Sequence, residues 1–219
     1  ASDVYKRQNN SSSLVVSSNR TFNFPLQVQG SSWTVSVGLQ PSGQLCTVIN
    51  GTGTNLSANV TNVTVSCVIR TYTVSGTVIG NTDTVTLTKN GAGTQTVSAG
   101  GGSFSFAAQN VGTSYSVTTT TPTGQTCTVT NGTGINLVTN ITNVTVTCVT
   151  KKFTVSGRVI GNTGAVTLTN NGGDTKTVTY NGGSFTFTAQ SYGSAYSIAA
   201  TGPASQTCTV TNGTGTNLT

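Results

Sequence analysis

Residues 125–148 read QTCTVTNGTGINLVTNITNVTVTC, and both ends of this segment alternate apolar and hydroxyl side chains. Val144, Val146 and Cys148 fall on one face of an extended chain, and the intervening threonines fall on the other. A period of two residues is typical of β-strands with one buried and one solvent-exposed face. The turn dipeptide Asn131-Gly132 separates the two alternating runs. The segment therefore predicts two neighbouring strands, each carrying one cysteine.

The same pattern recurs along the chain at a fixed interval. Residues 72–138 align without gaps on residues 153–219, with 42 of 67 positions identical, and an earlier copy matches from Pro41 to Cys67. Repetition at an interval of about 80 residues predicts tandem structural units. We expect a first copy over 9–70 that lacks its front strands, a complete middle copy over 71–151, and a third copy over 152–219 that lacks its last strand.

Composition favours an all-β fold. The chain has no His, Met or Glu, and Thr, Ser, Asn, Gly and Val dominate it. Thr and Val suit half-buried strands, whereas Gly and Asn suit tight turns. Alternating runs separated by turn signals give about seven strands per copy, and a two-sheet antiparallel sandwich accommodates that number. We expect tandem antiparallel β-sandwiches of the Ig-like or prealbumin-like type.

The five cysteines follow the same interval. The spacing from Cys46 to Cys67 equals that from Cys127 to Cys148, while Cys208 has no partner at the corresponding distance because the sequence ends at Thr219. We expect disulfides Cys46–Cys67 and Cys127–Cys148, with Cys208 left unpaired by truncation. Zinc is the competing interpretation, but it needs four ligands and the chain has no His. Disulfides persist in oxidising compartments, which predicts an extracellular or cell-surface protein.

The first residues have a different origin from the rest. Asp3-Val-Tyr-Lys-Arg-Gln8 resembles the translation of a transposase-based sequencing adapter. We therefore treat residues 1–8 as an artefact, expect them to be disordered, and exclude them from the fold.

The motifs VSGTVIG, VTLTKNG, GGSFSF, YSV and QTCTVTNGTG, together with the run that ends at Cys148, resemble a tandem β-sandwich module of bacterial surface proteins and lipoproteins. This module is similar to carboxypeptidase-regulatory-like, prealbumin-type domains. The resemblance covers residues 9–219 apart from the missing tail. It implies a stalk, spacer or display domain of an adhesin-like protein, without chemistry of its own, since a fold alone does not specify a function.

Residues suited to catalysis are scarce. Asp83 and Asp174 lie in different copies, and glycine stands at each equivalent position in the other copy. General acid–base catalysis needs a paired or positioned titratable group, and a catalytic triad needs a base for its nucleophile. Calcium needs several converging carboxylates, and an intramolecular isopeptide needs a buried acid beside its Lys–Asn pair. We expect no enzyme activity, no metal site and no cofactor.

The sequence leaves more than one kind of binding partner open. The net charge is +6, but the basic residues are dispersed, whereas nucleic-acid binders concentrate them, so we expect no nucleic-acid binding. The first hypothesis is a structural spacer whose partners are the neighbouring domains of the same chain. The alternative is a module that binds cell-surface glycans or proteins; Trp33, Tyr115 and Tyr196 could stack on sugars, although packing at the sheet end is favoured. The third copy also presents an unpaired strand edge that could accept a donor, which truncation explains more simply.

Overall fold

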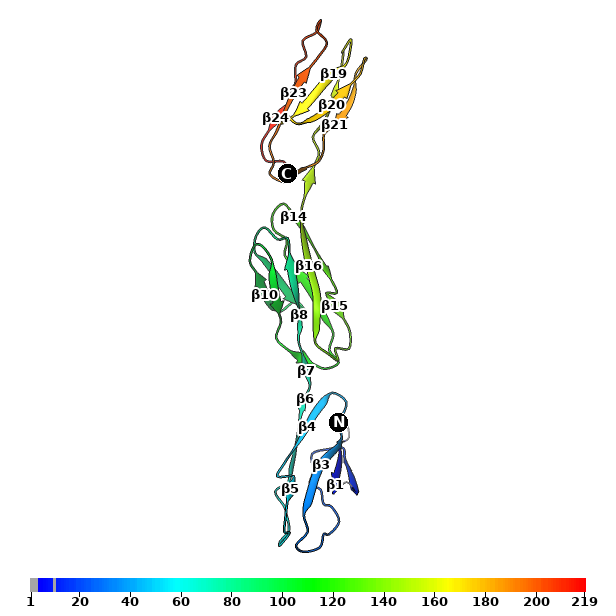
Figure 1. Ribbon diagram of the computed structural model, residues 1–219, viewed down its shortest axis with the longest axis vertical. Helices are drawn as coiled ribbons and strands as arrows, with labels where there is room; N and C mark the ends of the chain where they lie inside the picture. The colour runs from blue at the N-terminus through cyan, green and yellow to red at the C-terminus, as the bar shows by residue number, and fades with distance from the viewer. Residues whose placement is uncertain (1–3, 10) are drawn as a thin grey trace. The chain divides into compact units, whose positions relative to one another are not determined.

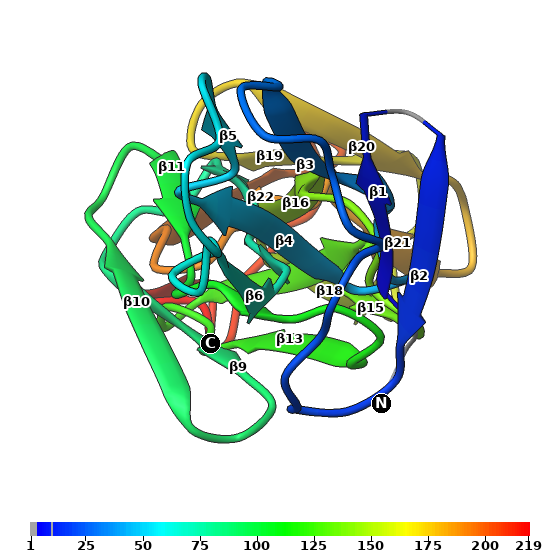
Figure 2. The same ribbon diagram turned by 90° about the horizontal axis from the view of Figure 1, so that it is seen from below.

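We describe a computed structural model of the chain over residues 4–9 and 11–219 (Figures 1 and 2). In this described part the regular structure is entirely β, in several small antiparallel sheets, which is compatible with a β-sandwich fold. The expected all-β class is confirmed. Short polar turns, many with Asn or Gly at positive φ, connect the strands, as in Asn90-Gly91 and Asn131.

The first copy contains six strands: β1 (Val4–Gln8), β2 (Ser12–Val16), β3 (Trp33–Leu39), β4 (Gln44–Ile49), β5 (Thr52–Gly53) and β6 (Thr64–Ile69). One sheet has the order β2-β1-β3-β5, and β4 pairs with β6 in a second sheet. The buried apolar residues of this copy include Val16, Val35 and Cys46.

The middle copy contains ten strands: β7 (Thr71–Tyr72), β8 (Val74–Ile79), β9 (Val85–Lys89), β10 (Gly93–Val97), β11 (Gly102–Ser105), β12 (Gln109–Asn110), β13 (Tyr115–Thr119), β14 (Gln125–Thr130), β15 (Thr133–Gly134) and β16 (Ile141–Thr150). Three of them have two residues, which leaves seven longer strands. The two four-stranded sheets have the orders β10-β9-β13-β15 and β11-β8-β16-β14. In Figure 2, β10, β9 and β13 lie side by side in green.

The third copy contains eight strands: β17 (Lys152–Phe153), β18 (Ser156–Val159), β19 (Val166–Asn170), β20 (Asp174–Val178), β21 (Gly183–Thr186), β22 (Gln190–Ser191), β23 (Tyr196–Thr201) and β24 (Thr214–Gly215). One sheet has the order β20-β19-β23-β24, and β18 pairs with β21. The core of this copy is Val166, Leu168, Val178 and Phe187. Its strands begin at the positions equivalent to those of the middle copy, as in β9 and β19, except that β18 begins one position later than β8.

The expectation that residues 1–8 stand apart from the fold is wrong for residues 4–8; residues 1–3 lie outside the described residues. Strand β1 pairs antiparallel with both β2 and β3, in the place that β9 takes between β10 and β13. Backbone hydrogen bonds of a ladder do not depend on side-chain identity, so a segment of almost any sequence can fill a strand position. Lys6 is 4% exposed where the equivalent core residues are Leu87 and Leu168.

The chain also divides by contacts into two compact units, and this division does not follow the copies. One unit comprises residues up to Ser75, with Ser105–Ser116 and Gly132–Asn143; the other comprises Gly76–Phe104, Val117–Asn131 and Val144–Thr219. The boundary runs through the middle copy. The domain ranges 9–70, 71–151 and 152–219 therefore stay predictions from the sequence.

Candidate functional site

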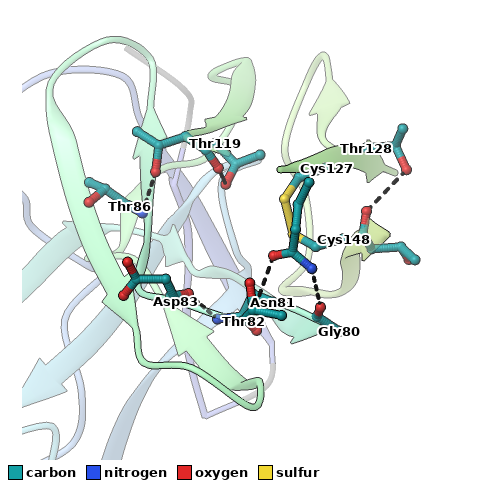
Figure 3. The surroundings of a disulfide bond; sticks show 12 residues. Gly80, Asn81, Thr82, Asp83, Thr86, Thr119, Cys127, Thr128 and Cys148 are labelled. Carbon is teal, nitrogen blue, oxygen red and sulfur yellow. Dashed lines mark hydrogen bonds between the residues drawn. A yellow bond between two sulfur atoms is a disulfide. The ribbon is translucent and has the colours of Figure 1, made fainter. Parts of the chain in front are cut away.

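The first candidate feature is the pair of disulfide-linked strands. Cys127 in β14 lies directly opposite Cys148 in β16, with Cα atoms 4.0 Å apart, and the two form a disulfide (Figure 3). Cys46 in β4 and Cys67 in β6 have the same register, the same 4.0 Å separation and a disulfide. Both predicted disulfides are thus present, and each crosslinks adjacent antiparallel strands. These two bonds indicate an oxidising, extracellular environment.

Cys208, the equivalent of Cys127 in the third copy, is a free, half-buried cysteine. It packs against the core of Val166, Leu168, Val178 and Phe187. The part of the chain described by the structure contains no group of three or more Cys, Asp or Glu side chains placed to hold a metal ion.

A glutamine at the start of the disulfide-bearing strand makes two hydrogen bonds to a neighbouring turn; we call this pair of bonds the glutamine clamp. In the middle copy, Gln125 Nε2 donates to the Gly80 carbonyl (2.7 Å), and Thr82 N–H donates to Gln125 Oε1 (2.9 Å), around the turn drawn in Figure 3. Gln125 is 3% exposed, so both polar ends of its amide are buried and satisfied. The third copy repeats the clamp: Gln206 Nε2 donates to Gly161, and Thr163 donates to Gln206 Oε1 (3.1 and 2.7 Å).

The second candidate feature is the junction between the first and middle copies. Arg70 is the single residue between β6 and β7. Its N–H donates to the carbonyl of Gly43 (2.9 Å), and its carbonyl accepts from the N–H of Val111 (2.9 Å). Strand β7 then pairs with β12, which aligns Thr71 with Asn110. The linking residue is therefore bonded on both sides by backbone groups.

The junction between the middle and third copies has the same geometry. Lys151 N–H donates to the Gly124 carbonyl (2.8 Å), and Tyr192 N–H donates to the Lys151 carbonyl (2.8 Å). A Cβ built on Gly124 would collide with the ring of Tyr192, and this ring lies 6.4 Å from that of Phe153, centroid to centroid. Close packing thus accompanies the backbone bonds at Lys151. The side chains of Arg70 and Lys151 are both exposed, and at the first junction Arg70 Nε adds a hydrogen bond to the Gln44 carbonyl (3.1 Å).

The two acids considered for chemistry occupy separate positions. The Asp83 carboxylate accepts from the N–H of Thr84 (2.6 Å). Asp174 Oδ2 accepts from Thr188 N–H (2.6 Å), and Lys176 Nζ lies 3.6 Å from its other oxygen. The Thr188 hydrogen bond, more than the nearby lysine, lowers the pKa of Asp174 below its ordinary value. Each carboxylate is engaged locally, and the structure does not bring them together.

Three aromatic residues stand at the start of equivalent strands and pack in the same way. Trp33, Tyr115 and Tyr196 each cover a glycine of the paired two-residue strand; these glycines are Gly53, Gly134 and Gly215. This is the sheet-end packing favoured by the sequence. Trp33 differs from the tyrosines because it also lines a pocket of about 460 Å³ formed with residues 54–62.

Sequence reasoning missed the glutamine clamp and the junction partners Gly43, Gly124, Val111 and Tyr192. The signal for the clamp was available, because Gln125 and Gln206 occupy equivalent positions of two copies in an otherwise apolar–hydroxyl alternation. The sequence signal for the junction partners was weaker. Val111 and Tyr192 occupy equivalent positions but differ in side chain, and both bond through backbone atoms.

Within residues 4–9 and 11–219 there is no helix long and apolar enough to cross a membrane. A scan against protein-family models and a search of curated proteins both find no match for this sequence.

Proposed function

We propose that this chain is a non-catalytic structural spacer, a stalk segment of a secreted or cell-surface bacterial protein related to tandem prealbumin-type sandwich modules. The observation that carries the proposal is the repeated junction. At both Arg70 and Lys151, one linking residue is hydrogen-bonded on one side to the preceding copy and on the other to the following copy. A flexible tether would need an unbonded, Gly/Ser-rich linker instead.

The path of the chain through each junction supports the same role. Residues 64–79 form three strands, β6, β7 and β8, interrupted only at Arg70 and Thr73. An extended segment rises about 3.3 Å per residue. A load applied along such a segment is borne by backbone that is already extended, and the disulfide anchors the strand that leads into the junction.

The solvent-facing residues also suit a stalk. The outward positions of the paired strands are largely threonines, as in Thr126, Thr128 and Thr130 of β14. Only 5% of all residues are charged. A hydroxyl-rich surface of this kind stays hydrated and offers few ion-pairing groups to partners.

Small-angle X-ray scattering of the chain tests the proposal. We expect an elongated particle, with each copy adding roughly 30–35 Å along the long axis, the length of the ten-residue strand β16 at about 3.3 Å per residue. A compact globular profile would contradict a spacer. Reduction with a thiol serves as the matched control, since it opens the disulfides without changing the linking residues.

A second candidate function is glycan binding by the first copy. The lining of the Trp33 pocket mixes apolar residues (Leu56, Ala58 and Val60) with threonines, a serine and three asparagines (Asn55, Asn59 and Asn62), which can donate and accept hydrogen bonds beside an aromatic ring. A glycan array tests this with Trp33→Tyr and Trp33→Ala. The tyrosine variant restores the residue type of Tyr115 and Tyr196 and should fold, so loss of a glycan signal in the alanine variant alone would support binding. No signal for the unaltered chain would refute it.

A further inference from the structure

Two neighbouring strands of the middle copy, β8 and β16, run in the same direction. The N–H of Ile141 donates to the carbonyl of Thr73 (2.9 Å), at the start of both strands. Further along, a Cβ on Gly76 would collide with the carbonyl of Val144. Both contacts join residues separated by the same number of positions, so the residue numbers rise together along the two strands. The pair is therefore parallel, next to the antiparallel pair of β16 with β14.

Side chains add hydrogen bonds at the start of this parallel pair. The N–H of Thr73 donates to Asn140 Oδ1 (2.9 Å), while its carbonyl accepts from Ile141. Ser75 Oγ donates to the carbonyl of Ile141 (3.0 Å). Both backbone polar groups of Thr73 and both of Ile141 are thus bonded across the two strands, so the first residues of the pair are joined by more than the backbone ladder.

The far end of the pair is held by the glutamine clamp (Figure 3). Gly80 directly follows β8, and a Cβ on it would collide with the carbonyl of Cys148 in β16. Gln125, the first residue of β14, bonds to the Gly80 carbonyl and to the Thr82 N–H. Cys127 of β14 forms the disulfide with Cys148. The end of β8 is therefore attached to two strands that are covalently joined to each other.

One face of the parallel pair is shielded from water. Val74 and Val78 of β8 are at most 1% exposed, and Val144 and Val146 of β16 are 0% exposed. Hydrogen bonds beside such side chains lie in a low local dielectric, where they are electrostatically stronger than in water. The pair therefore combines a protected backbone ladder with side-chain bonds at both of its ends.

The path of the chain determines how a load acts on this pair. The chain enters the middle copy through β7 and β8 and leaves it at the end of β16, next to Lys151. Because β8 and β16 are parallel, the point of entry and the point of exit lie at opposite ends of the pair. Tension between these points slides one strand along the other and loads their hydrogen bonds together. Tension applied at one end of the pair would instead break the same bonds one after another, which requires less force.

We propose that the middle copy is a force-bearing module, which resists tension by shear of the β8–β16 pair and whose disulfide limits the length of chain released when that pair separates. As a role in a stalk this rests on the proposed spacer function, whereas the strand geometry behind it does not. The loop closed by Cys127 and Cys148 has a sequence separation of 21 and stays closed when β8 is pulled away. Opening the disulfide should add roughly 70 Å to the released length, at about 3.3–3.6 Å per residue.

Single-molecule force spectroscopy of the full chain tests the direction of loading. Handles on noncanonical amino acids at Thr71 and Thr150, both exposed, confine the load to the middle copy and pull the pair in shear. The matched control keeps the handle at Thr71 and moves the other to the exposed Thr139, just before β16, so that both handles lie at one end of the pair. Forced unfolding is governed by the unfolding rate, so at one loading rate the rupture force should be severalfold higher in shear. Equal rupture forces in the two geometries would overturn the proposal.

The released length tests the role of the disulfide. In the shear geometry, the Cys127→Ser, Cys148→Ser double variant should release roughly 70 Å more chain than the unaltered protein. If that variant does not fold, a thiol reductant added to the unaltered chain after rupture should produce the same additional step. An unchanged length in both cases would overturn the limit set by the disulfide.

These results can be told apart from a failure of the spacer function. A compact scattering profile together with a higher rupture force in shear would refute the spacer alone. An elongated profile together with equal rupture forces would refute the force-bearing module alone.

Discussion

Gly76 in β8 lies directly beneath the carbonyl group of Val144 in β16, so closely that a Cβ on Gly76 would collide with it. Both residues are buried, and Val144 is 0% exposed. The four-stranded sheet β11-β8-β16-β14 therefore requires glycine at this point. Gly157 holds the equivalent place in the third copy, where a flexible phenylalanine ring, not backbone, is the obstacle.

Gly76→Ala should accordingly destabilise the middle copy by about 3 kcal/mol or more, because the β16 backbone must shift to admit the methyl group. Gly157→Ala is the matched control and should cost less than about 1 kcal/mol, since only the Phe185 side chain must move. Hydrogen exchange resolved by residue gives the local free energy of opening in each copy. Equal losses in the two variants would contradict the placement of β16.

Removal of the middle disulfide gives a second prediction. The Cys127→Ala, Cys148→Ala double variant loses the closure of a loop with a sequence separation of 21. In the chain-entropy account this costs on the order of 3 kcal/mol. We expect the melting temperature of the middle copy to fall by more than about 5 °C.

Faster hydrogen exchange at the Val144 and Val146 amides should locate the effect of that double variant in β16. Cys208→Ser is the control, because Cys208 is a free thiol and its loss leaves both disulfides intact. A middle copy whose stability is unchanged by the double variant would refute the structural role of the bond.

Lys6 gives a third prediction, based on its burial at a core position. Its Nζ lies 3.5 Å from the centroid of the Phe22 ring. Burial, with a smaller contribution from repulsion by Arg20, lowers the pKa of Lys6 below its ordinary value of 10.5. The unfolded chain therefore binds more protons than the folded chain between the lowered pKa and 10.5, so the free energy of unfolding should rise with pH in that window.

Lys6→Leu should remove this rise and stabilise the first copy by about 2 kcal/mol at pH 7, because leucine is the residue at both equivalent positions. Urea unfolding followed by the fluorescence of Trp33, the one tryptophan in the chain, reports on this copy. Alkylation of Cys208 beforehand prevents thiol exchange at high pH. A variant less stable than the unaltered chain would show that Lys6 does not occupy a leucine position.

The strand pattern and both disulfides were predictable because they follow from local periodicity and spacing. Val144, Val146 and Cys148 share a face by sequence alone, and the spacing of the two cysteine pairs is identical. The seven longer strands of the middle copy match the expected number.

Other features depend on tertiary contacts that periodicity does not encode. Strand β1 was excluded on the origin of its residues, yet the open edge of β3 pairs with it, since ladder hydrogen bonds accept any backbone. The junctions at Arg70 and Lys151 use main-chain groups of partners that are distant in the sequence (Val111 and Tyr192) and that differ in side chain. Periodicity in the sequence does not predict these backbone hydrogen bonds.

In a semi-rigid spacer, the bonded junction at Lys151 must restrict motion between the copies on either side of it. Spin labels carried by noncanonical amino acids at the exposed positions Thr128 and Thr175 flank the Lys151 junction. Pulsed electron–electron double resonance should give a narrow, single distance distribution. That distribution should broaden in Lys151→Pro, which lacks the N–H that bonds to Gly124. A distribution equally broad with and without the proline would contradict a semi-rigid spacer.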